Sequence, residues 1–141
     1  IRIAYLIKCF GSNSDLDDMV EIGNNDLSFS STNRYFAHSI GDVSVTWGIH
    51  RVYTSTGFTK GSEYMQFTWM LAEFWTWNNI VYGYYNGETL TRSFTPPASS
   101  GYLRINIDPD STARGAYIDY IYVRKYVDPE PTVSIGAEEE L

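Results

Sequence analysis

The sequence predicts an all-β domain built as a two-sheet antiparallel jelly-roll sandwich. Aromatic residues make up 16% of the chain, and β-branched residues, which favour strands, are abundant. Apolar residues alternate with polar ones in several stretches, and no stretch keeps the repeat of 3.6 residues that an amphipathic helix requires. Short strand-like segments recur about every 8 to 12 residues between turn-forming clusters, which is typical of sandwiches and jelly rolls.

Composition excludes two classes of partner. The 141 residues include 17 acidic and 10 basic side chains, giving a formal net charge of -7, and such a charge repels a nucleic-acid backbone. We therefore expect no nucleic-acid partner. No apolar run approaches the roughly 20 residues of a membrane-spanning helix, so we expect no membrane span. The single cysteine, Cys9, allows no intrachain disulfide and is expected to be a small buried side chain.

The first half of the chain is placed by its strand pattern alone. In the first ten residues the apolar side chains fall on one face, at Ile1, Ile3, Tyr5, Ile7 and Cys9, which predicts a strand from Ile1 to Phe10. Further strands are expected at Met19 to Ile22, Leu27 to Phe29, Arg34 to Ser39, Val43 to Trp47 and Ile49 to Tyr53. The polar segments Gly11 to Asp18 and Thr54 to Ser62 are expected to be loops.

The second half carries stronger local signals. Alternation of apolar and polar residues from Tyr64 to Phe74 predicts one half-buried strand, with Trp69 in the core. Asn86-Gly87 suits the positive backbone angles of a type I′ turn, so Ile80 to Tyr85 and Glu88 to Phe94 should form a hairpin. Strands at Tyr102 to Ile107 and Ala116 to Tyr126 follow. We expect a single domain over residues 1–126 and a Pro-containing acidic tail or linker over residues 127–141.

The segment Trp69 to Asn79 holds three tryptophans and two amides. Sugar binding requires flat apolar surfaces for the C–H faces of pyranose rings, with polar groups nearby for the hydroxyls. Trp75 and Trp77 alternate at a strand end and share an orientation, as do Tyr82 and Tyr84 on the next strand. The predicted carbohydrate site consists of Trp75, Trp77, Asn78, Asn79, Tyr82, Tyr84 and Asn86. The alternative interpretation of these rings is core or cross-strand packing.

A family resemblance supports this hypothesis. The order of a Trp-rich strand at Tyr64 to Phe74, the Asn-Gly hairpin, the Pro96-Pro97 link and a closing strand at Ile118 to Val123 resembles the concanavalin-like jelly rolls, including laminin-G-like modules, legume-lectin-like domains and family-16 glycoside hydrolases. The segment Val123 to Pro131 resembles the close of modules in large archaeal and bacterial surface proteins. The resemblance implies a polysaccharide or glycan partner, an extracellular or cell-surface location, and one structural Ca²⁺ at Asp119. The alternative for Asp119 is an ion pair or a loop cap.

The same residues are compatible with other functions. The aromatic faces could instead bind other protein chains, in which case the domain is a structural or adhesive subunit that self-associates or binds other surface-protein domains. A hydrolase of the family-16 kind would use Asp15, Asp17 and Glu21, but their spacing departs from the family pattern; Ca²⁺ binding or a solvated loop also suits this acidic segment. We therefore expect no catalytic residues.

His38 and His50 are expected to be surface or hydrogen-bonded residues rather than zinc ligands. Because the chain begins with Ile1 and shows no leader, we expect a processed product or a piece of a longer protein.

Overall fold

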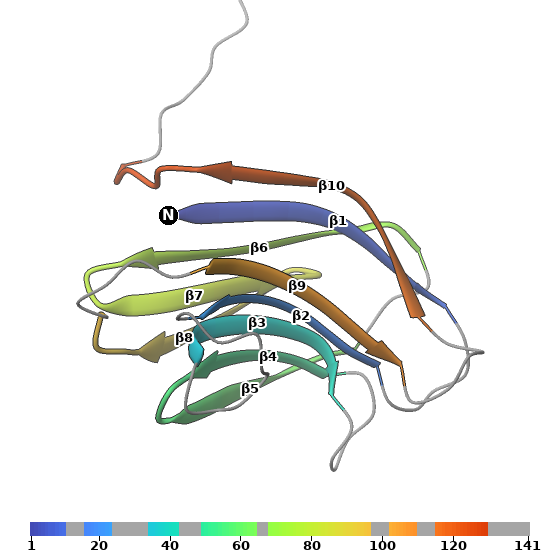
Figure 1. Ribbon diagram of the computed structural model, residues 1–141, viewed down its shortest axis with the longest axis horizontal. Coiled ribbons are helices and arrows are strands. Elements are labelled where there is room, and N and C mark those ends of the chain that lie inside the picture. The colour runs from blue at the N-terminus through green and yellow to red at the C-terminus, as the bar shows by residue number, and fades with distance from the viewer. Residues whose placement is uncertain are drawn as a thin grey trace, which may run out of the picture.

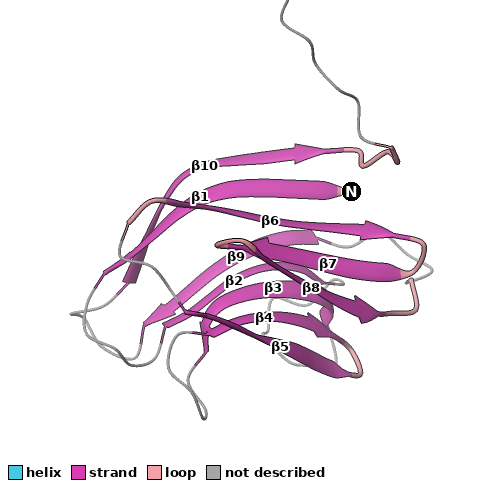
Figure 2. Ribbon diagram, turned by 180° about the vertical axis from the view of Figure 1, so that it is seen from behind, coloured by secondary structure: helices cyan, strands magenta, loops and turns pink. Residues whose placement is uncertain are grey.

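The protein folds into two five-stranded antiparallel sheets that face each other (Figures 1 and 2). The computed structural model describes residues 1–10, 16–23, 34–42, 49–64, 68–96, 102–109 and 115–129. Its strands are β1 (Arg2–Phe10), β2 (Leu16–Gly23), β3 (Arg34–Asp42), β4 (Ile49–Thr54), β5 (Gly57–Tyr64), β6 (Met70–Trp77), β7 (Ile80–Tyr85), β8 (Glu88–Ser93), β9 (Tyr102–Pro109) and β10 (Gly115–Arg124). Within these ranges, no helix is long and apolar enough to cross a bilayer.

The first and last strands are neighbours in one sheet. One sheet has the order β10-β1-β6-β7-β8 and the other has the order β5-β4-β3-β2-β9. The first described strand, β1, therefore lies between the last strand, β10, and β6. The chain crosses from one sheet to the other after β1, β5, β8 and β9, and the prediction of an all-β, two-sheet antiparallel architecture is confirmed.

The core lies between the two sheets and follows the predicted alternation along β1. Ile3, Tyr5, Ile7 and Cys9 are buried, while Ile1 at the chain end is exposed. The opposite sheet contributes Phe36, whose ring meets that of Phe74 edge-on at 5.8 Å between centroids. Each large apolar side chain buried in this way stabilises the fold by about 1.5–3 kcal/mol. The full cluster is Ile3, Tyr5, Ile7, Cys9, Phe36, Ile40, Val52, Ala72, Phe74, Val81, Tyr85 and Leu90.

Tight turns connect β6 to β7 and β7 to β8. Asn86 and Gly87 have φ angles of 47° and 87°, so the predicted hairpin is confirmed with both central residues in the left-handed region that a type I′ turn requires. Asn78 and Asn79 have φ angles of 49° and 59°. This second turn uses asparagine, the residue other than glycine that most readily adopts such angles.

Three predictions about local structure are wrong. The expected loop at Thr54 to Ser62 contains β5, which pairs with β4; its polar sequence lacks alternation because it is an edge strand. The expected strand from Tyr64 to Phe74 is divided, since β5 ends at Tyr64 and β6 begins at Met70. As a result Trp69, expected in the core, is exposed. Finally, β2 begins at Leu16, inside the expected loop, because Leu16 and Asp17 pair with the end of β9.

Several expectations fall on residues outside the described ranges. These are the strands at Leu27 to Phe29 and Val43 to Trp47, together with residues 130–141 of the tail. The last strand was expected to extend to Tyr126 but ends at Arg124. Beyond the last pair of this ladder, Arg2 with Arg124, Tyr126 packs onto Trp75 and Trp77 of β6.

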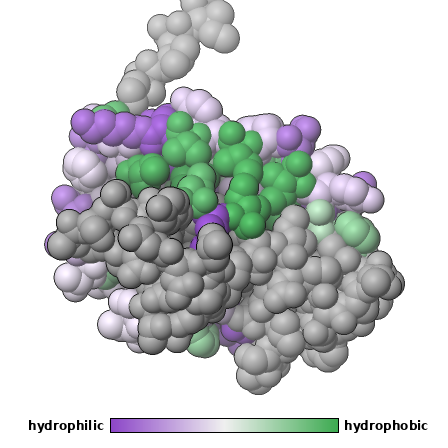
Figure 3. Space-filling model, viewed as in Figure 1, coloured by the Kyte–Doolittle hydropathy of each residue, from purple (hydrophilic) through white to green (hydrophobic). Residues whose placement is uncertain are grey.

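The edge strands of the two sheets lie opposite each other in two places, called seams here, and the contacts at the two seams differ. At the seam between β5 and β8, the Glu88 carboxylate accepts a hydrogen bond from the Ser62 backbone N–H at 3.0 Å, and the Thr59 hydroxyl donates to the Thr91 carbonyl at 3.0 Å. The opposite seam, between β9 and β10, exposes apolar side chains. Leu103, Ile105 and Val123 are 41%, 45% and 45% exposed, and hydrophobic surface gathers in this region in Figure 3.

Candidate functional site

The aromatic cluster, defined as Trp75, Trp77, Tyr82 and Tyr126, lies on the outer face of the sheet that contains β6 and β7. Trp75 is directly opposite Tyr82 in the pairing of β6 with β7. Their rings are parallel, with centroids 5.1 Å apart. All four side chains are partly exposed, so they are not core residues. The predicted shared orientation of Trp75 and Trp77 is consistent with both residues contacting Tyr126.

Tyr126 joins the cluster from the segment that follows β10. Its ring centroid is 6.1 Å from that of Trp75 in a nearly parallel arrangement and 5.5 Å from that of Trp77 in an edge-on arrangement. Tyr126 is not among the predicted site residues. The alternation of Tyr120, Tyr122, Arg124 and Tyr126 indicated a shared face, but contact with a strand two places away in the sheet depends on tertiary structure.

A charged pair borders the cluster on β1 and β6. The Arg2 guanidinium donates to the Glu73 carboxylate, with 2.6 Å between Nη2 and Oε2. Arg2 is also directly opposite Trp75, and its Cζ lies 5.2 Å from the centre of the indole ring. An arginine in this position is attracted by the electron-rich face of the indole. The row Arg2, Trp75 and Tyr82 therefore spans three neighbouring strands.

The remaining predicted residues fall at the two ends of β7. Asn78 and Asn79 are exposed in the turn that follows Trp77, at the same end as the cluster. Asn86 lies in the turn at the other end of β7, roughly 20 Å away along the strand. Tyr84 is opposite Glu73 and is partly exposed. The structure thus gathers Trp75, Trp77 and Tyr82 toward the first turn, whereas Tyr84 lies toward the other end of β7, two residues from Asn86.

Short polar residues lie beside the two tyrosines of β7. Thr91 is directly opposite Tyr82, and Thr89 is directly opposite Tyr84. Both threonines are exposed. Because a threonine side chain is short, it leaves much of a neighbouring ring face uncovered, and its hydroxyl can donate and accept hydrogen bonds. Tyrosine rings beside exposed hydroxyls are the combination that sugar recognition requires.

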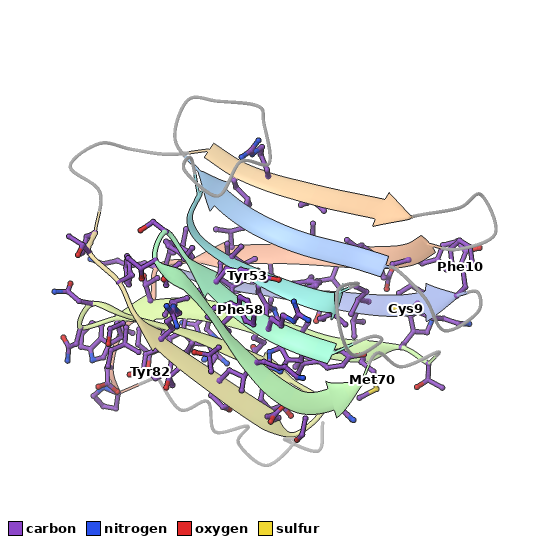
Figure 4. The ribbon with its side chains drawn as sticks, turned by 90° about the horizontal axis from the view of Figure 1, so that it is seen from below. Cys9, Phe10, Tyr53, Phe58, Met70 and Tyr82 are labelled. Atoms are coloured by element: carbon purple, nitrogen blue, oxygen red, sulfur yellow. The ribbon has the colours of Figure 1, made fainter. Side chains whose placement is uncertain are left out.

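A second cation–aromatic group lies on the other sheet, apart from the aromatic cluster (Figure 4). The rings of Tyr53 on β4 and Phe58 on β5 are 5.4 Å apart, and the Arg51 Cζ is 4.9 Å from the Phe58 ring centre. The Arg51 guanidinium also donates to the Tyr53 hydroxyl at 3.2 Å. Within this group the Phe58 ring is about half exposed, at 48%.

The two histidines are neither surface residues nor far apart in space. Both are fully buried between the sheets, and the Tyr5 hydroxyl is 2.9 Å from Nδ1 of His38. The expected hydrogen-bonded role is therefore confirmed for His38, whereas a surface position is wrong for both. Burial, followed by the nearby His50, lowers the pKa of His38 well below its usual value. Burial lowers the pKa of His50 to about 4, although the Glu88 carboxylate opposes this shift.

The described residues add little to the metal and catalytic hypotheses. Within the described ranges no group of three His, Cys, Asp or Glu side chains could hold a metal ion. Asp119, the expected Ca²⁺ ligand, is exposed in β10. Of the acidic residues considered for hydrolysis, Asp17 and Glu21 both belong to β2, four residues or roughly 13 Å apart along a strand, whereas Asp15 lies outside the described ranges.

Comparison of the chain with protein-family models, with curated proteins and with solved structures finds no match.

Proposed function

We propose that this protein is a non-catalytic carbohydrate-binding module of the concanavalin-like jelly-roll class, and that its site is the outer face of β6 and β7. The main support is the parallel pair formed by Trp75 and Tyr82, which is partly exposed on an outer sheet face. Aromatic side chains in a soluble domain are usually buried in its core. Here several occupy one patch of surface beside polar groups, as in a sugar-binding site.

The site offers both kinds of contact that a glycan uses. Tyr82 and Tyr84 present ring faces to the C–H faces of pyranose rings. The hydroxyls of Thr91 and Thr89, directly opposite on β8, and the side chains of Asn78 and Asn79 supply hydrogen-bond donors and acceptors. Because these groups extend along β7 rather than lining a closed cavity, the site suits an extended oligosaccharide or polysaccharide.

The jelly-roll topology and the extracellular or cell-surface location are part of the same proposal. The first and last strands are neighbours in one sheet, and four connections cross between the sheets; these features are compatible with a jelly roll. A polysaccharide ligand places the protein outside the cell or on its surface. A structural Ca²⁺ at Asp119 would stabilise β10 without contacting the sugar. A role in adhesion would follow from glycan binding by a surface domain.

The proposal is tested by retention of the purified chain on insoluble polysaccharides and by a glycan array, with and without Ca²⁺. Tyr82→Ala and Trp77→Ala should each weaken retention roughly tenfold, the size expected when one ring contact is lost. Trp69→Ala removes a more exposed ring outside the cluster, and Phe58→Ala removes one from the other sheet, so both should bind normally.

Circular dichroism and urea unfolding will establish that each variant is folded. The proposal is wrong if the wild-type chain binds none of the glycans. It is also wrong if the two control variants lose binding as much as Tyr82→Ala does.

A further inference from the structure

The indole ring of Trp75 is covered on both of its faces. From β7, the Tyr82 ring lies parallel to it, with centroids 5.1 Å apart. From β1, the Arg2 Cζ lies 5.2 Å from the centre of the indole. Because β1 and β7 flank β6 in the sheet, these two groups lie on opposite faces of the indole. A sugar that stacks on an aromatic ring requires an open ring face, so Trp75 has none to offer.

Arg2 is held against Trp75 by a charged partner. Its Nη2 is 2.6 Å from Oε2 of Glu73, and both side chains are less than a quarter exposed. The carboxylate neutralises the guanidinium, so the pair adds no net charge to this surface. The row Arg2, Trp75 and Tyr82 ends at the face of Tyr82 that is turned toward β8. Its neighbour on that side is the short, exposed side chain of Thr91.

Hydroxyl side chains follow the outer face of β8 beside the tyrosines of β7. The β7–β8 strip is defined as Tyr82 and Tyr84 of β7 together with Thr89, Thr91 and Ser93 of β8. The three β8 residues are exposed, and they share one face because they alternate along the strand. Since a tyrosine is much longer than a serine or a threonine, the strip has the form of a step, with ring faces along its wall and hydroxyls along its floor.

The described residues of the strip carry no charge. The two charged residues of β8, Glu88 and Arg92, share the inner face with the buried Leu90. The Glu88 carboxylate accepts a hydrogen bond from the Ser62 N–H at 3.0 Å, and the Arg92 guanidinium donates to the Thr54 hydroxyl at 2.8 Å. In a chain of net charge -7, a strip without a cation disfavours an acidic ligand. A neutral ligand with many hydroxyls meets no such repulsion.

The outer edge of β8 does not suit an added protein strand. The Thr59 hydroxyl of β5 donates to the Thr91 carbonyl at 3.0 Å, and Arg92 donates to the Phe58 carbonyl at 3.0 Å. These contacts hold β5 along the side on which an added strand would have to form its ladder of backbone hydrogen bonds. A ligand of the strip must therefore bind through ring faces and hydroxyls, which are the contacts that a glycan makes.

We propose that the β7–β8 strip binds a neutral, linear glycan that runs along β8, and that Trp75 and Arg2 position Tyr82 without touching the sugar. This inference rests on the proposed carbohydrate-binding function and names its ligand class. The six residues of β7 span roughly 20 Å, which accommodates several sugar units. The turns at the two ends of the strand hold Asn79 and Asn86, whose amides would border the two ends of such a chain.

A glycan array that pairs neutral chains with acidic chains of the same backbone tests the ligand class. Suitable pairs are β-1,4-linked mannose with mannuronate oligomers and β-1,4-linked glucose with glucuronate oligomers. The wild-type chain should retain the neutral members roughly tenfold or more above their acidic counterparts. Preference for the acidic members would overturn this inference and leave carbohydrate binding intact. Failure to bind any glycan of the array would overturn the proposed function itself.

A charge placed in the strip tests its location. Thr91→Lys removes a central hydroxyl and introduces a cation, so it should weaken binding of the neutral chain roughly tenfold and shift the preference toward the acidic member of each pair. Thr68→Lys, the matched control, puts the same charge on an exposed threonine before the start of β6 and should change neither property. The proposal fails if both variants change selectivity alike or if neither does.

Conservative and drastic substitutions separate support from contact. Trp75→Phe keeps a ring against Tyr82 and should bind within about twofold of the wild type, whereas Trp75→Ala leaves Tyr82 unsupported and should weaken binding roughly tenfold. Tyr82→Leu keeps an apolar side chain but removes the flat face, and it should weaken binding as much as Trp75→Ala does. Circular dichroism establishes that each variant is folded. A loss in Trp75→Phe as large as that in Tyr82→Leu would show that the indole itself contacts the sugar.

Discussion

The rings of His38 and His50 meet edge-on inside the sandwich, with centroids 4.6 Å apart and an angle of 81° between their planes. Both side chains are fully buried. Among the described residues, Oε2 of Glu88 lies 3.6 Å from Nδ1 of His50, which is too long for a hydrogen bond. Two positively charged imidazoles cannot be accommodated at this distance without solvent, so the native fold requires both rings to be neutral.

Stability should therefore fall as the pH is lowered from neutral to 4. The pKa of His50 is about 4 in the native state against 6.5 for an unperturbed histidine, so the unfolded chain binds more protons throughout this interval. Its folded-state pKa is depressed, which means that the stabilisation is complete above pH 6.5 and is lost as the pH falls toward the native pKa. This one group should reduce the free energy of unfolding by about 3 kcal/mol, and His38 acts in the same direction.

Urea unfolding of the wild type and of His50→Gln at a series of pH values measures this effect. The variant should lose a large part of the pH dependence, because glutamine does not titrate. Lys125→Gln, an exposed substitution, should retain it. Equal pH dependence in the wild type and in His50→Gln would show that the His50 ring is not the group that destabilises the fold in acid.

Gly83 should not tolerate even alanine. A Cβ atom at this position would meet Cγ2 of Val52 and would lie 2.9 Å from Cδ2 of His38, both on the opposite sheet. Overpacking of this kind costs about 1–3 kcal/mol, so Gly83→Ala should lower the free energy of unfolding by that amount. The cost should be smaller in a Val52→Ala background, where the nearest methyl group is absent. Additive effects of the two substitutions in a double-mutant cycle would contradict the close contact.

Tyr126 should shield the indoles of Trp75 and Trp77 from solvent. Its ring contacts both of them, although it lies beyond the end of β10. In a Trp47→Phe, Trp69→Phe background, which leaves Trp75 and Trp77 as the two tryptophans of the chain, Tyr126→Ala should shift the fluorescence emission to longer wavelength and increase quenching by acrylamide. Tyr120→Ala, which removes an exposed tyrosine that is not part of the cluster, is the control. An unchanged spectrum in Tyr126→Ala would mean that the ring does not cover the tryptophans in solution.

The sequence reveals those features that depend on short-range chemistry. Alternation along β1 predicts which of its side chains enter the core, because successive side chains of a strand point to opposite faces. Asn86-Gly87 predicts its turn because positive φ angles favour these residues. The outward position of Tyr120 and Tyr122 follows from the same alternation, and both are exposed.

Other features depend on the other sheet or on distant strands. The polar strand β5 carries no apolar pattern, because it lies at an edge and its partner β4 supplies the order. His38 and His50 are separated by 12 positions, and only the pairing of β3 with β4 brings them together. The aromatic rings of the proposed carbohydrate site were predicted from the sequence. Their polar neighbours were not, because Arg2 is opposite Trp75 and Thr91 is opposite Tyr82 only through a strand order that the sequence does not reveal.

Arg92 should contribute more to stability through its geometry than through its charge. Its Nε donates to the Thr54 hydroxyl at 2.8 Å and its Nη1 donates to the Phe58 carbonyl at 3.0 Å, so one planar group joins β8 to both β4 and β5. Lysine keeps the charge but cannot make two bonds in this fixed geometry. Arg92→Lys should therefore lower the free energy of unfolding by about 1–2 kcal/mol, measured by urea denaturation.

The control variant Arg124→Lys, at the end of β10, should change the free energy of unfolding by less than about 0.5 kcal/mol. In a Thr54→Val background the effect of Arg92→Lys should shrink, because one of the two acceptors is gone; an undiminished effect would show that the bond to Thr54 does not stabilise this edge.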